Sequence, residues 1–301
     1  MLSPMKRAAL IVNPFASRVS EQRLAAVEEA LAPHAEIETL PTARGGHAVE
    51  LAREAARTRD AVLVYSGDGG FNEVLNGLDG PVPLGFIPGG RTNVLPRALG
   101  LPRDPVAAAQ RIGNALDRDR TRTISVGRVN GRRFGFAAGV GVDAEFIRRI
   151  DQHRRGHDSR LPGDLVAALL LARQFAEHRG GYEPALEIQG LGRVATVLVA
   201  NGEPTTYAGP LGLRLVPAAT FQDGLDFAAP PLLRARDFAS VALRSLRGHE
   251  HPGFLYGHDL DRIRVVCDSP TPLQADGEDL GDVEEATFEC ERAAVRVLVG
   301  D

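Results

Sequence analysis

Apolar residues follow two alternating patterns over the first 120 positions of the chain. Short apolar runs are typical of buried strands, and segments whose apolar residues recur every three or four positions are typical of helices. Alternation of the two at this length predicts a parallel, doubly wound α/β sheet. The expected strands are 7–12, 35–41, 60–66 and 82–88, and the expected helices are 20–32, 47–57, 71–78, 92–100 and 104–116.

The pattern changes near Arg122, where strand-like runs separated by turn residues take over. Two such runs flank Asn130-Gly131, a dipeptide typical of tight hairpin turns. One helix is expected at about 163–179, and eight short strand-like runs follow it. The sequence therefore predicts an α/β domain at 1–121 and a mostly antiparallel, β-rich domain at 122–289.

Composition and charge narrow the class of protein. The chain has 301 residues, of which 44% are hydrophobic and 25% charged, enough for two domains with a sizeable core. A net charge of −4 gives no general attraction to nucleic acid, so no nucleic-acid partner is expected. Its two cysteines, Cys267 and Cys290, have no metal-type spacing and suit a reducing compartment.

No apolar segment predicts export or a membrane span. The N-terminal apolar run is short and is broken by Asn13-Pro14, and the longest apolar helical run, 165–172, is far below the ~20 residues that cross a bilayer. We therefore expect a cytoplasmic protein, with contact to a membrane surface and self-association left open.

Lys6 is the only lysine in the chain. No lysine follows a glycine loop, which excludes a P-loop, and no strand carries the lysine of a protein kinase. A Schiff-base mechanism would have to use the N-terminal strand. Any phosphate bound at a glycine loop must therefore rely on backbone N–H groups or arginine.

The stretch "VYSGDGGFNEVLNGL" (64–78) places a glycine loop between an expected strand and an expected helix. Backbone N–H groups at such a helix start form a phosphate cradle that needs no lysine. Asp68 would repel a phosphate unless it faced Mg²⁺ or a hydroxyl. A surface turn that uses glycine for positive φ is the alternative.

A second glycine loop, "IPGGRTNVL", repeats this arrangement after the next strand. Thr92 or Asn93 is alternatively a simple helix N-cap. Two such loops at the carboxyl ends of neighbouring parallel strands mark the edge of the sheet where ligands of open α/β folds bind.

Acidic turns are the main candidates for chemistry in the second half. Asp223 lies in "TFQDGLDF", and Asp276 and Glu278 lie in "QADGEDLGD" (274–282). Solvated turns are the alternative in both places. The histidines show no metal or triad pattern, and the charged stretch around His153 and His157 is interpreted as a solvated loop or as a patch that contacts anionic head groups.

Seven motifs in this order resemble the diacylglycerol kinase catalytic-domain family, which includes bacterial lipid kinases. The resemblance covers nearly the whole chain. The motifs are "IVNPFAS", "LPTARGGHAVELAREA", "SGDGGFNEVLNG", "IPGGRTNVLPRALGLP", "GVGVDAEF", "PLGLRLVPAATFQDGLDF" and "LQADGED".

The resemblance implies a fold and an activity. The fold is the NAD kinase/diacylglycerol kinase type, in which a nucleotide-binding α/β domain is joined to a β-rich domain and residues 290–301 return to the first domain. The activity is Mg²⁺- and ATP-dependent phosphorylation of a lipid hydroxyl, a transferase reaction of phospholipid metabolism. Diacylglycerol, a sphingoid base, a polyprenol and a glycolipid all remain open as acceptors.

The resemblance also implies roles for individual residues. Glu278 would be the general base for the lipid hydroxyl, with Asp276 and Asp68 the other acids of the catalytic centre. The Mg²⁺ site of the second half would be Asp223 with the carbonyl oxygens of Thr220 and Leu225. The residues expected at ATP are Asn13, Thr42, Ser66, Gly67, Asp68, Gly69, Gly70, Phe71, Asn72, Glu73, Thr92 and Asn93.

The chain departs from the family pattern at three positions. Ser66 stands where the family has its first loop glycine, Gly70 where it has the loop threonine, and Val94 where it has an aspartate. Losing the threonine hydroxyl removes one phosphate contact, and losing the aspartate affects the orientation of the first loop.

Two other functions stay open beside the lipid kinase: an NAD kinase-like enzyme, and a lipid- or nucleotide-binding protein that is catalytically weak or inactive. For the lipid kinase, we expect peripheral contact with anionic membranes through four arginines, and the helix 163–179 either borders the lipid or belongs to the core. The arginines are Arg148, Arg149, Arg154 and Arg155.

Overall fold

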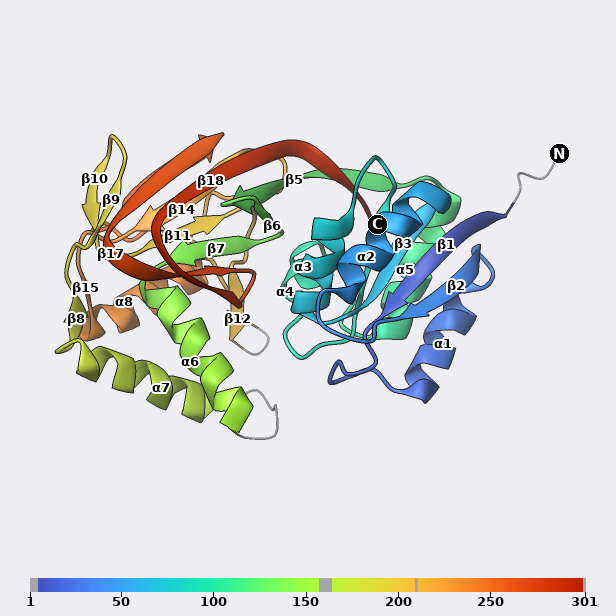
Figure 1. Cartoon of the computed structure of the whole chain (residues 1–301), viewed down its shortest axis with the longest axis horizontal. Helices are drawn as coiled ribbons and strands as arrows, with labels where there is room; N and C mark the ends of the chain where they lie inside the picture. The colour runs from blue at the N-terminus through green and yellow to red at the C-terminus, as the bar shows by residue number, and fades with distance from the viewer. Residues whose placement is uncertain (1–4, 157–163, 209–210, 300–301) are drawn as a thin grey trace. The chain divides into compact units, whose positions relative to one another are not determined.

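The computed structural model describes residues 5–156, 164–208 and 211–299 (Figure 1). The chain divides into two compact units. Unit 1 holds residues 1–126 and 292–301, and unit 2 holds residues 127–291. The boundaries fall inside β5 (Thr121–Val129) and β18 (Glu278–Leu298), whereas the sequence analysis placed the change at Arg122.

Unit 1 contains a parallel sheet in the order β4–β3–β1–β2. The end of β18 joins its β4 edge, where Val297 pairs in parallel with Leu84. All six residues of β3 are buried, as expected for a central parallel strand covered on both faces. The strands are β1 (Lys6–Val12), β2 (Ala35–Pro41), β3 (Ala61–Ser66) and β4 (Leu84–Pro88).

Five helices connect these strands. Helix α1 packs against α5, and α2 packs against α3. The Ser20 and Asp104 side chains cap α1 and α5 by accepting from the N–H groups of Arg23 and Ala107. The helices are α1 (Glu21–Leu31), α2 (His47–Thr58), α3 (Asp68–Gly77), α4 (Val94–Ala98) and α5 (Pro105–Asp117). The predicted α/β alternation is confirmed element by element.

The strand order creates a switch point between β1 and β3. The chain leaves β1 through α1 toward β2, at one edge of this four-stranded order. It leaves the neighbouring β3 through α3 toward β4, at the opposite edge. Loops that diverge from adjacent strand ends open a crevice at the carboxyl edge, which is where open α/β sheets bind ligands.

Unit 2 is built mainly of antiparallel strands in the order β16–β14–β11–β7–β17–β18. The predicted hairpin is confirmed, because β5 pairs with β6 (Arg132–Phe134) across Asn130 and Gly131, whose φ angles are 46° and 88°. The core includes Phe134 and Phe288, which meet edge to face with ring centroids 6.5 Å apart.

The remaining strands of unit 2 are mostly short. The four runs predicted after residue 260 belong to two long strands, β17 and β18, which pair with each other. Of these two, β17 spans Arg262–Ala275. The short strands are β7 (Ala137–Val140), β8 (Gly181–Tyr182), β9 (Leu186–Ile188), β10 (Gly192–Val194), β11 (Val197–Ala200), β12 (Thr206–Ala208), β13 (Leu211–Leu213), β14 (Leu225–Ala229), β15 (Leu233–Arg234) and β16 (Leu255–Leu260).

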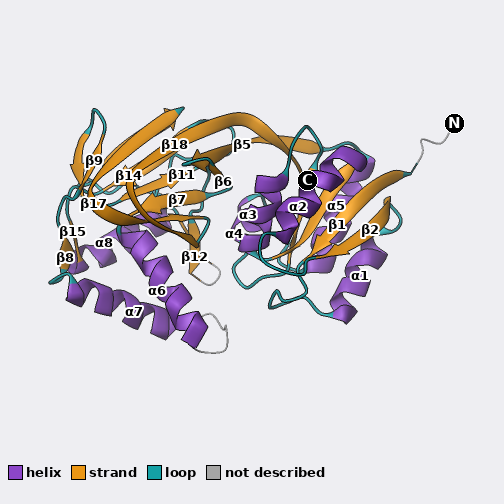
Figure 2. Ribbon diagram, in the orientation of Figure 1, coloured by secondary structure: helices purple, strands orange, loops and turns teal. Residues whose placement is uncertain are grey.

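The helices of unit 2 correct the sequence analysis. The predicted helix 163–179 is present as α7 (Asp164–Glu177), and α6 (Val142–Gly156) lies beside it (Figure 2). The charged stretch that contains His153 is therefore helical as far as Gly156 rather than a loop. Its Arg148 and Arg149 form ion pairs. His157 lies outside the described residues. Helix α8 (Phe238–Arg247), preceded by a 3₁₀ turn at Ala235–Asp237, has an amphipathic pattern that the sequence analysis missed.

Candidate functional site

A cavity of about 160 Å³ opens in unit 1 at the switch point between β1 and β3. It brings together five of the residues that the sequence analysis assigned to one site, although they are spread over 60 positions of the chain. These five are Asn13, Thr42, Ser66, Gly70 and Glu73, and the wall is completed by Ile11, Phe15, Arg44, Gly45, Ala48 and Val64.

The backbone holds the first two of these residues in place. The N–H of Asn13 donates to the carbonyl of Tyr65 at 3.1 Å, which ties the end of β1 to the end of β3. The Asn13 side chain accepts from the N–H of Phe15 at 3.0 Å and so shapes the turn after β1. The Thr42 N–H donates to the Val12 carbonyl at 2.8 Å, and Thr42 is buried.

Two helix N-termini border this cavity. The N-cap residues are Gly67 for α3 and Gly46 for α2, and glycine has no side chain that could accept from the first N–H groups of the helix. Gly46 has φ 79°, which favours glycine. The carboxylate of Glu73 accepts from the Ala48 N–H at 3.2 Å, so it stabilises the start of α2. N–H groups of a first helical turn lack intrahelical acceptors and carry the positive end of the helix dipole, so this edge favours an anion.

Asp68 joins the two glycine loops. Its two carboxylate oxygens accept from the N–H groups of Asn93 at 2.9 Å and Val94 at 2.6 Å. The sequence analysis required Mg²⁺ or a hydroxyl to explain a carboxylate here, and backbone amides supply that explanation instead. The same bonds explain how the loops stay oriented with Val94 at the family's aspartate position, since Val94 contributes its backbone.

Asn93 shapes the second loop rather than capping α4 with its side chain. It has φ 52°, its Oδ1 accepts from the Gly90 N–H at 2.8 Å, and its Nδ2 donates to the Gly90 carbonyl at 2.7 Å. Asn93 is buried and Thr92 is half-buried, and neither lines the cavity. Their expected contacts with ATP remain predictions.

The side chains of Phe71 and Asn72 point into the core of unit 1. Phe71 meets Phe86 edge to face at 5.3 Å, and the buried Asn72 accepts from the Asn76 side chain at 3.1 Å. Any contact of these two residues with ATP would therefore be made by their backbone. Their expected contacts with ATP remain predictions.

In unit 2, the acidic turn between β17 and β18 holds Asp276 in a structural role. Asp276 is buried, has φ 49°, and accepts from the N–H groups of Gly135 at 2.6 Å, Phe136 at 3.0 Å and Ala137 at 3.2 Å. The carboxylate therefore fixes the start of β7 against the turn. Its expected catalytic role remains a prediction.

Glu278 follows two residues later and has a different environment. Its side chain is 48% exposed and forms an ion pair with Arg132 of β6. A carboxylate that is accessible to a ligand and oriented by an arginine can accept a proton from an alcohol. The structure thus separates the two acids of the turn, one fixed and one accessible.

Helix α6 holds this acidic turn from its other side. Arg148 contacts Asp279 through two nitrogens, at 2.9 and 3.0 Å, and Asp282 through a third at 2.6 Å. The Gln274 side chain donates to Asp143 at 2.9 Å and accepts from the Gly277 N–H at 3.0 Å. Sequence reasoning did not place Arg148, Asp143 and Gln274 together at this turn, because Arg148 and Asp143 lie on α6 and only the tertiary structure brings α6 beside Gln274 of β17.

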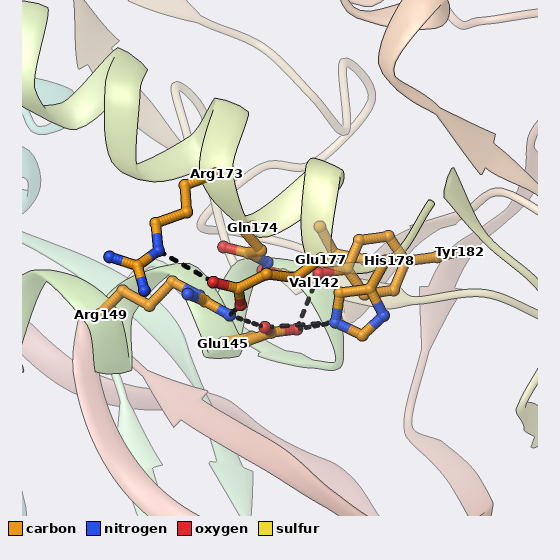
Figure 3. Close-up of polar contacts among 8 residues, drawn as sticks. All are labelled: Val142, Glu145, Arg149, Arg173, Gln174, Glu177, His178 and Tyr182. Carbon is orange, nitrogen blue, oxygen red and sulfur yellow. Dashed lines mark hydrogen bonds and ion pairs between the residues drawn. The ribbon is translucent and has the colours of Figure 1, made fainter. Parts of the chain in front are cut away.

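The next arginine of α6 joins two helices (Figure 3). Arg149 contacts Glu145 at 2.6 Å and Glu177 of α7 at 2.7 Å, and Glu145 also accepts from the Tyr182 hydroxyl at 2.7 Å. Burial, together with this carboxylate, raises the pKa of Tyr182. Arg148 and Arg149 therefore form ion pairs within unit 2, and their expected role in membrane binding remains a prediction. The side chains of Arg154 and Arg155 lie outside the described residues.

The proposed Mg²⁺ ligands lie in the turn before β14. One carboxylate oxygen of the exposed Asp223 accepts from the Thr220 hydroxyl at 2.6 Å, and the Asp223 N–H donates to the Thr220 carbonyl at 3.4 Å. Leu225 pairs with Leu260 in the sheet. The donors offered are hard oxygens, which suit Mg²⁺ by kind. Among the residues described, no group of three or more His, Cys, Asp or Glu could hold a metal ion.

Comparisons with known proteins agree with this architecture. The model of the diacylglycerol kinase catalytic domain matches residues 7–129. A diacylglycerol kinase of Bacillus subtilis is 30% identical over 283 residues, covering 91% of this chain and 90% of the relative. A crystal structure of a diacylglycerol kinase from Bacillus anthracis superimposes with a TM-score of 0.72 at 19% identity, covering 99% and 98% of the two chains.

A more distant structure shares the fold. An NAD kinase from Archaeoglobus fulgidus, solved in complex with ATP, has a TM-score of 0.54 at 15% identity and covers 98% of this chain and 94% of its own. The fold is therefore that of the kinases that include NAD kinases and diacylglycerol kinases. Within that class, the chain belongs to the diacylglycerol kinase family.

Proposed function

We propose that this chain is an ATP-dependent kinase that transfers the γ-phosphate to the hydroxyl of a lipid. The observation that carries the proposal is the cavity at the switch point of unit 1, where two helix N-termini and the first glycine loop meet. These features suit a phosphate-rich ligand without a lysine, and membership of a kinase family selects a nucleoside triphosphate.

ATP is the proposed nucleotide because a kinase of the same fold has been solved with it. In this chain, the first turn of α3 would cradle the phosphates with its backbone N–H groups. Asn13 and Thr42 would border the rest of the nucleotide from β1 and from the loop before α2. Asp68 would act indirectly, since it keeps the two loops together.

Glu278 is the proposed general base for the lipid hydroxyl. It is the accessible carboxylate of the acidic turn, whereas Asp276 is committed to three backbone N–H groups. Removing the hydroxyl proton makes the oxygen nucleophilic as it attacks phosphorus. Arg132 orients Glu278 through their ion pair.

Mg²⁺ would supply charge neutralisation at phosphate oxygens and support for the turn before β14. Asp223 would hold it with the carbonyl oxygens of Thr220 and Leu225. The Thr220 hydroxyl occupies one oxygen of Asp223, which leaves the second oxygen to face a cation.

The lipid acceptor requires contact with a membrane surface, which we propose to be peripheral. In the part of the chain that the structure describes, no helix is long and apolar enough to cross a bilayer. Helix α7 exposes Leu165 and Leu169, at 75% and 61%, and these leucines are better candidates for bilayer contact than the ion-paired arginines of α6.

The test is transfer of labelled phosphate from ATP to a total lipid extract, followed by identification of the product. NAD is offered in a parallel reaction, because the fold is shared with an NAD kinase. We expect labelled lipid with the wild-type chain, loss of that label with Glu278→Gln, and retained ATP binding. Glu284→Gln, an exposed change on the same strand, is the matched control.

Three results would contradict the proposal. Label in NAD alone would indicate an NAD kinase-like enzyme. Binding of ATP or lipid without any transfer would indicate a binding protein. Equal rates for Glu278→Gln and the wild type would remove Glu278 from its role as base.

A further inference from the structure

Ser66, the last residue of β3, carries a buried hydroxyl that has no hydrogen-bond partner among the described residues. The residue is only 1% exposed, yet it lines the cavity of unit 1. A buried polar atom without a partner is costly and uncommon in a native fold. A ligand in the cavity would give this hydroxyl its partner.

Gly70 lies four residues after Ser66, in the first turn of α3, and lines the same cavity. A Cβ built at Gly70 would overlap the Ser66 hydroxyl and lie 2.6 Å from the Ser66 Cβ. A Cβ at the neighbouring Gly69 would meet nothing within 4 Å. Positions 66 and 70 therefore cannot both carry a side chain on this backbone, whereas position 69 is free to carry one.

This geometry gives a physical meaning to two departures from the family pattern that otherwise look independent. Where the resemblance expects glycine followed four residues later by threonine, this chain has Ser66 followed by Gly70. In this chain the hydroxyl is at position 66 and the glycine at position 70, the reverse of the family pattern. Because only one of the two side chains fits, a side chain gained at one position requires glycine at the other.

We propose that Ser66 and Gly70 form a coupled pair in which the Ser66 hydroxyl donates a hydrogen bond to a phosphate oxygen of the bound nucleotide. Gly70 is then required to leave room for that hydroxyl. The acceptor is a phosphate because the hydroxyl lies beside the first turn of α3, where the helix dipole favours an anion. The hydrogen bond to phosphate is the ligand half of this inference, and it rests on the proposed function. The exclusion of a side chain at position 70 by Ser66 is the packing half, and it does not.

The ligand half is tested by calorimetric titration with Mg·ATP and with tripolyphosphate. Ser66→Ala keeps the Cβ and removes the hydroxyl, and we expect it to weaken binding of both probes about tenfold or more. The double variant Ser66→Gly/Gly70→Thr returns a hydroxyl from the other position, and we expect it to bind within about threefold of the wild type. Unchanged binding by Ser66→Ala would overturn the ligand half.

The packing half is tested by thermal unfolding without ligand, as a double-mutant cycle. Gly70→Thr in the wild type should lower Tm by about 3–6 °C, because it overpacks against Ser66, and the same change in Ser66→Gly should cost little. Gly69→Ala is the matched stability control for a change in this turn. Additive effects of the two substitutions would overturn the coupling.

The two halves fail separately. If the wild-type chain binds neither Mg·ATP nor tripolyphosphate, the proposed function and the ligand half fail together. The Tm cycle still decides the packing half, because it needs no ligand.

Discussion

Gly67 and Gly90 bring the two glycine loops of unit 1 into direct backbone contact. A Cβ added to Gly90 would lie 2.6 Å from the Cα of Gly67, and one added to Gly67 would lie 3.2 Å from the Cα of Gly90. The glycines are therefore required for the approach of one loop to the other. This approach lets Asp68 reach the amides that follow Gly90.

Gly90→Ala should accordingly destabilise unit 1. The obstacle is backbone, which cannot rotate away, so we expect a loss of about 1–3 kcal/mol in the free energy of unfolding. Urea denaturation measures the loss. Gly45→Ala is the control, because a Cβ there meets nothing within 4 Å. An equal effect of the two variants would contradict the contact.

Asp68→Asn should loosen the second loop. The amide keeps one oxygen acceptor and turns a donor toward the other N–H, so one of the bonds to Asn93 and Val94 is lost. We expect about 1–3 kcal/mol less stability and weaker ATP binding. Asp60→Asn is the matched control, since Asp60 also accepts from a backbone N–H but precedes β3, at its opposite end from Ser66.

Arg148→Gln should impair the proposed transfer more than nucleotide binding. Without its contacts to Asp279 and Asp282, the turn that carries Glu278 is less constrained, and small displacements of a catalytic group are costly. We expect kcat to fall roughly tenfold or more with KM for ATP unchanged. Arg173→Gln, at an arginine that is 75% exposed, is the control. A rise in KM for ATP with unchanged kcat would refute this role.

Asp143 should make stability depend on pH. Burial raises the pKa of Asp143 from 3.8 to about 6. The folded state therefore holds a proton that the unfolded state has lost, so this contribution is present below pH ~3.8 and is lost as the pH rises to about 6. A shift of about two units corresponds to roughly 3 kcal/mol.

Asp143→Asn removes this titration. Relative to the variant, the wild type should lose stability between pH 4 and pH 6.5 and change little above that range. Urea denaturation at several pH values measures the difference. A flat difference for Asp143→Asn would show that its carboxyl group does not titrate there.

Leu165→Ser/Leu169→Ser should reduce binding to vesicles. The two leucines lie one turn apart on α7 and are largely exposed, so burying them in the interface contributes apolar area. We expect co-sedimentation with anionic vesicles to weaken about tenfold or more. Leu191→Ser, at a leucine that is 56% exposed in the turn between β9 and β10, is the control. Equal losses in both variants would argue against a specific face.

The sequence located the candidate nucleotide site well because its signal is local. Glycine loops after apolar strands require particular backbone conformations, and the carboxyl ends of neighbouring parallel strands meet at one edge. The family resemblance assigned Asn13, Thr42, Ser66, Gly70 and Glu73 to one site, and all five line one cavity. Phe71 was assigned to the same site, and its side chain packs against Phe86.

The acidic turn between β17 and β18 has properties that neighbouring residues in the sequence do not determine. In the sequence, Asp276 and Glu278 are equivalent acids flanking one glycine. Their difference arises because β7 begins beside one of them and β6 presents Arg132 to the other. The contacts of α6 with this turn, an ion pair of Arg148 with Asp279 and a hydrogen bond from Gln274 to Asp143, likewise join residues 131 positions apart.

The sequence by itself determined the alternation of strands and helices, the hairpin at Asn130-Gly131, the two glycine loops and the family, because each depends on neighbouring residues or on ordered motifs. Only the tertiary structure decided which acid of the turn is buried and which is exposed, that Asp68 binds backbone amides, and that Ser66 excludes a side chain at position 70. Those properties depend on which atoms meet in space, and the spacing of residues along a chain does not specify them.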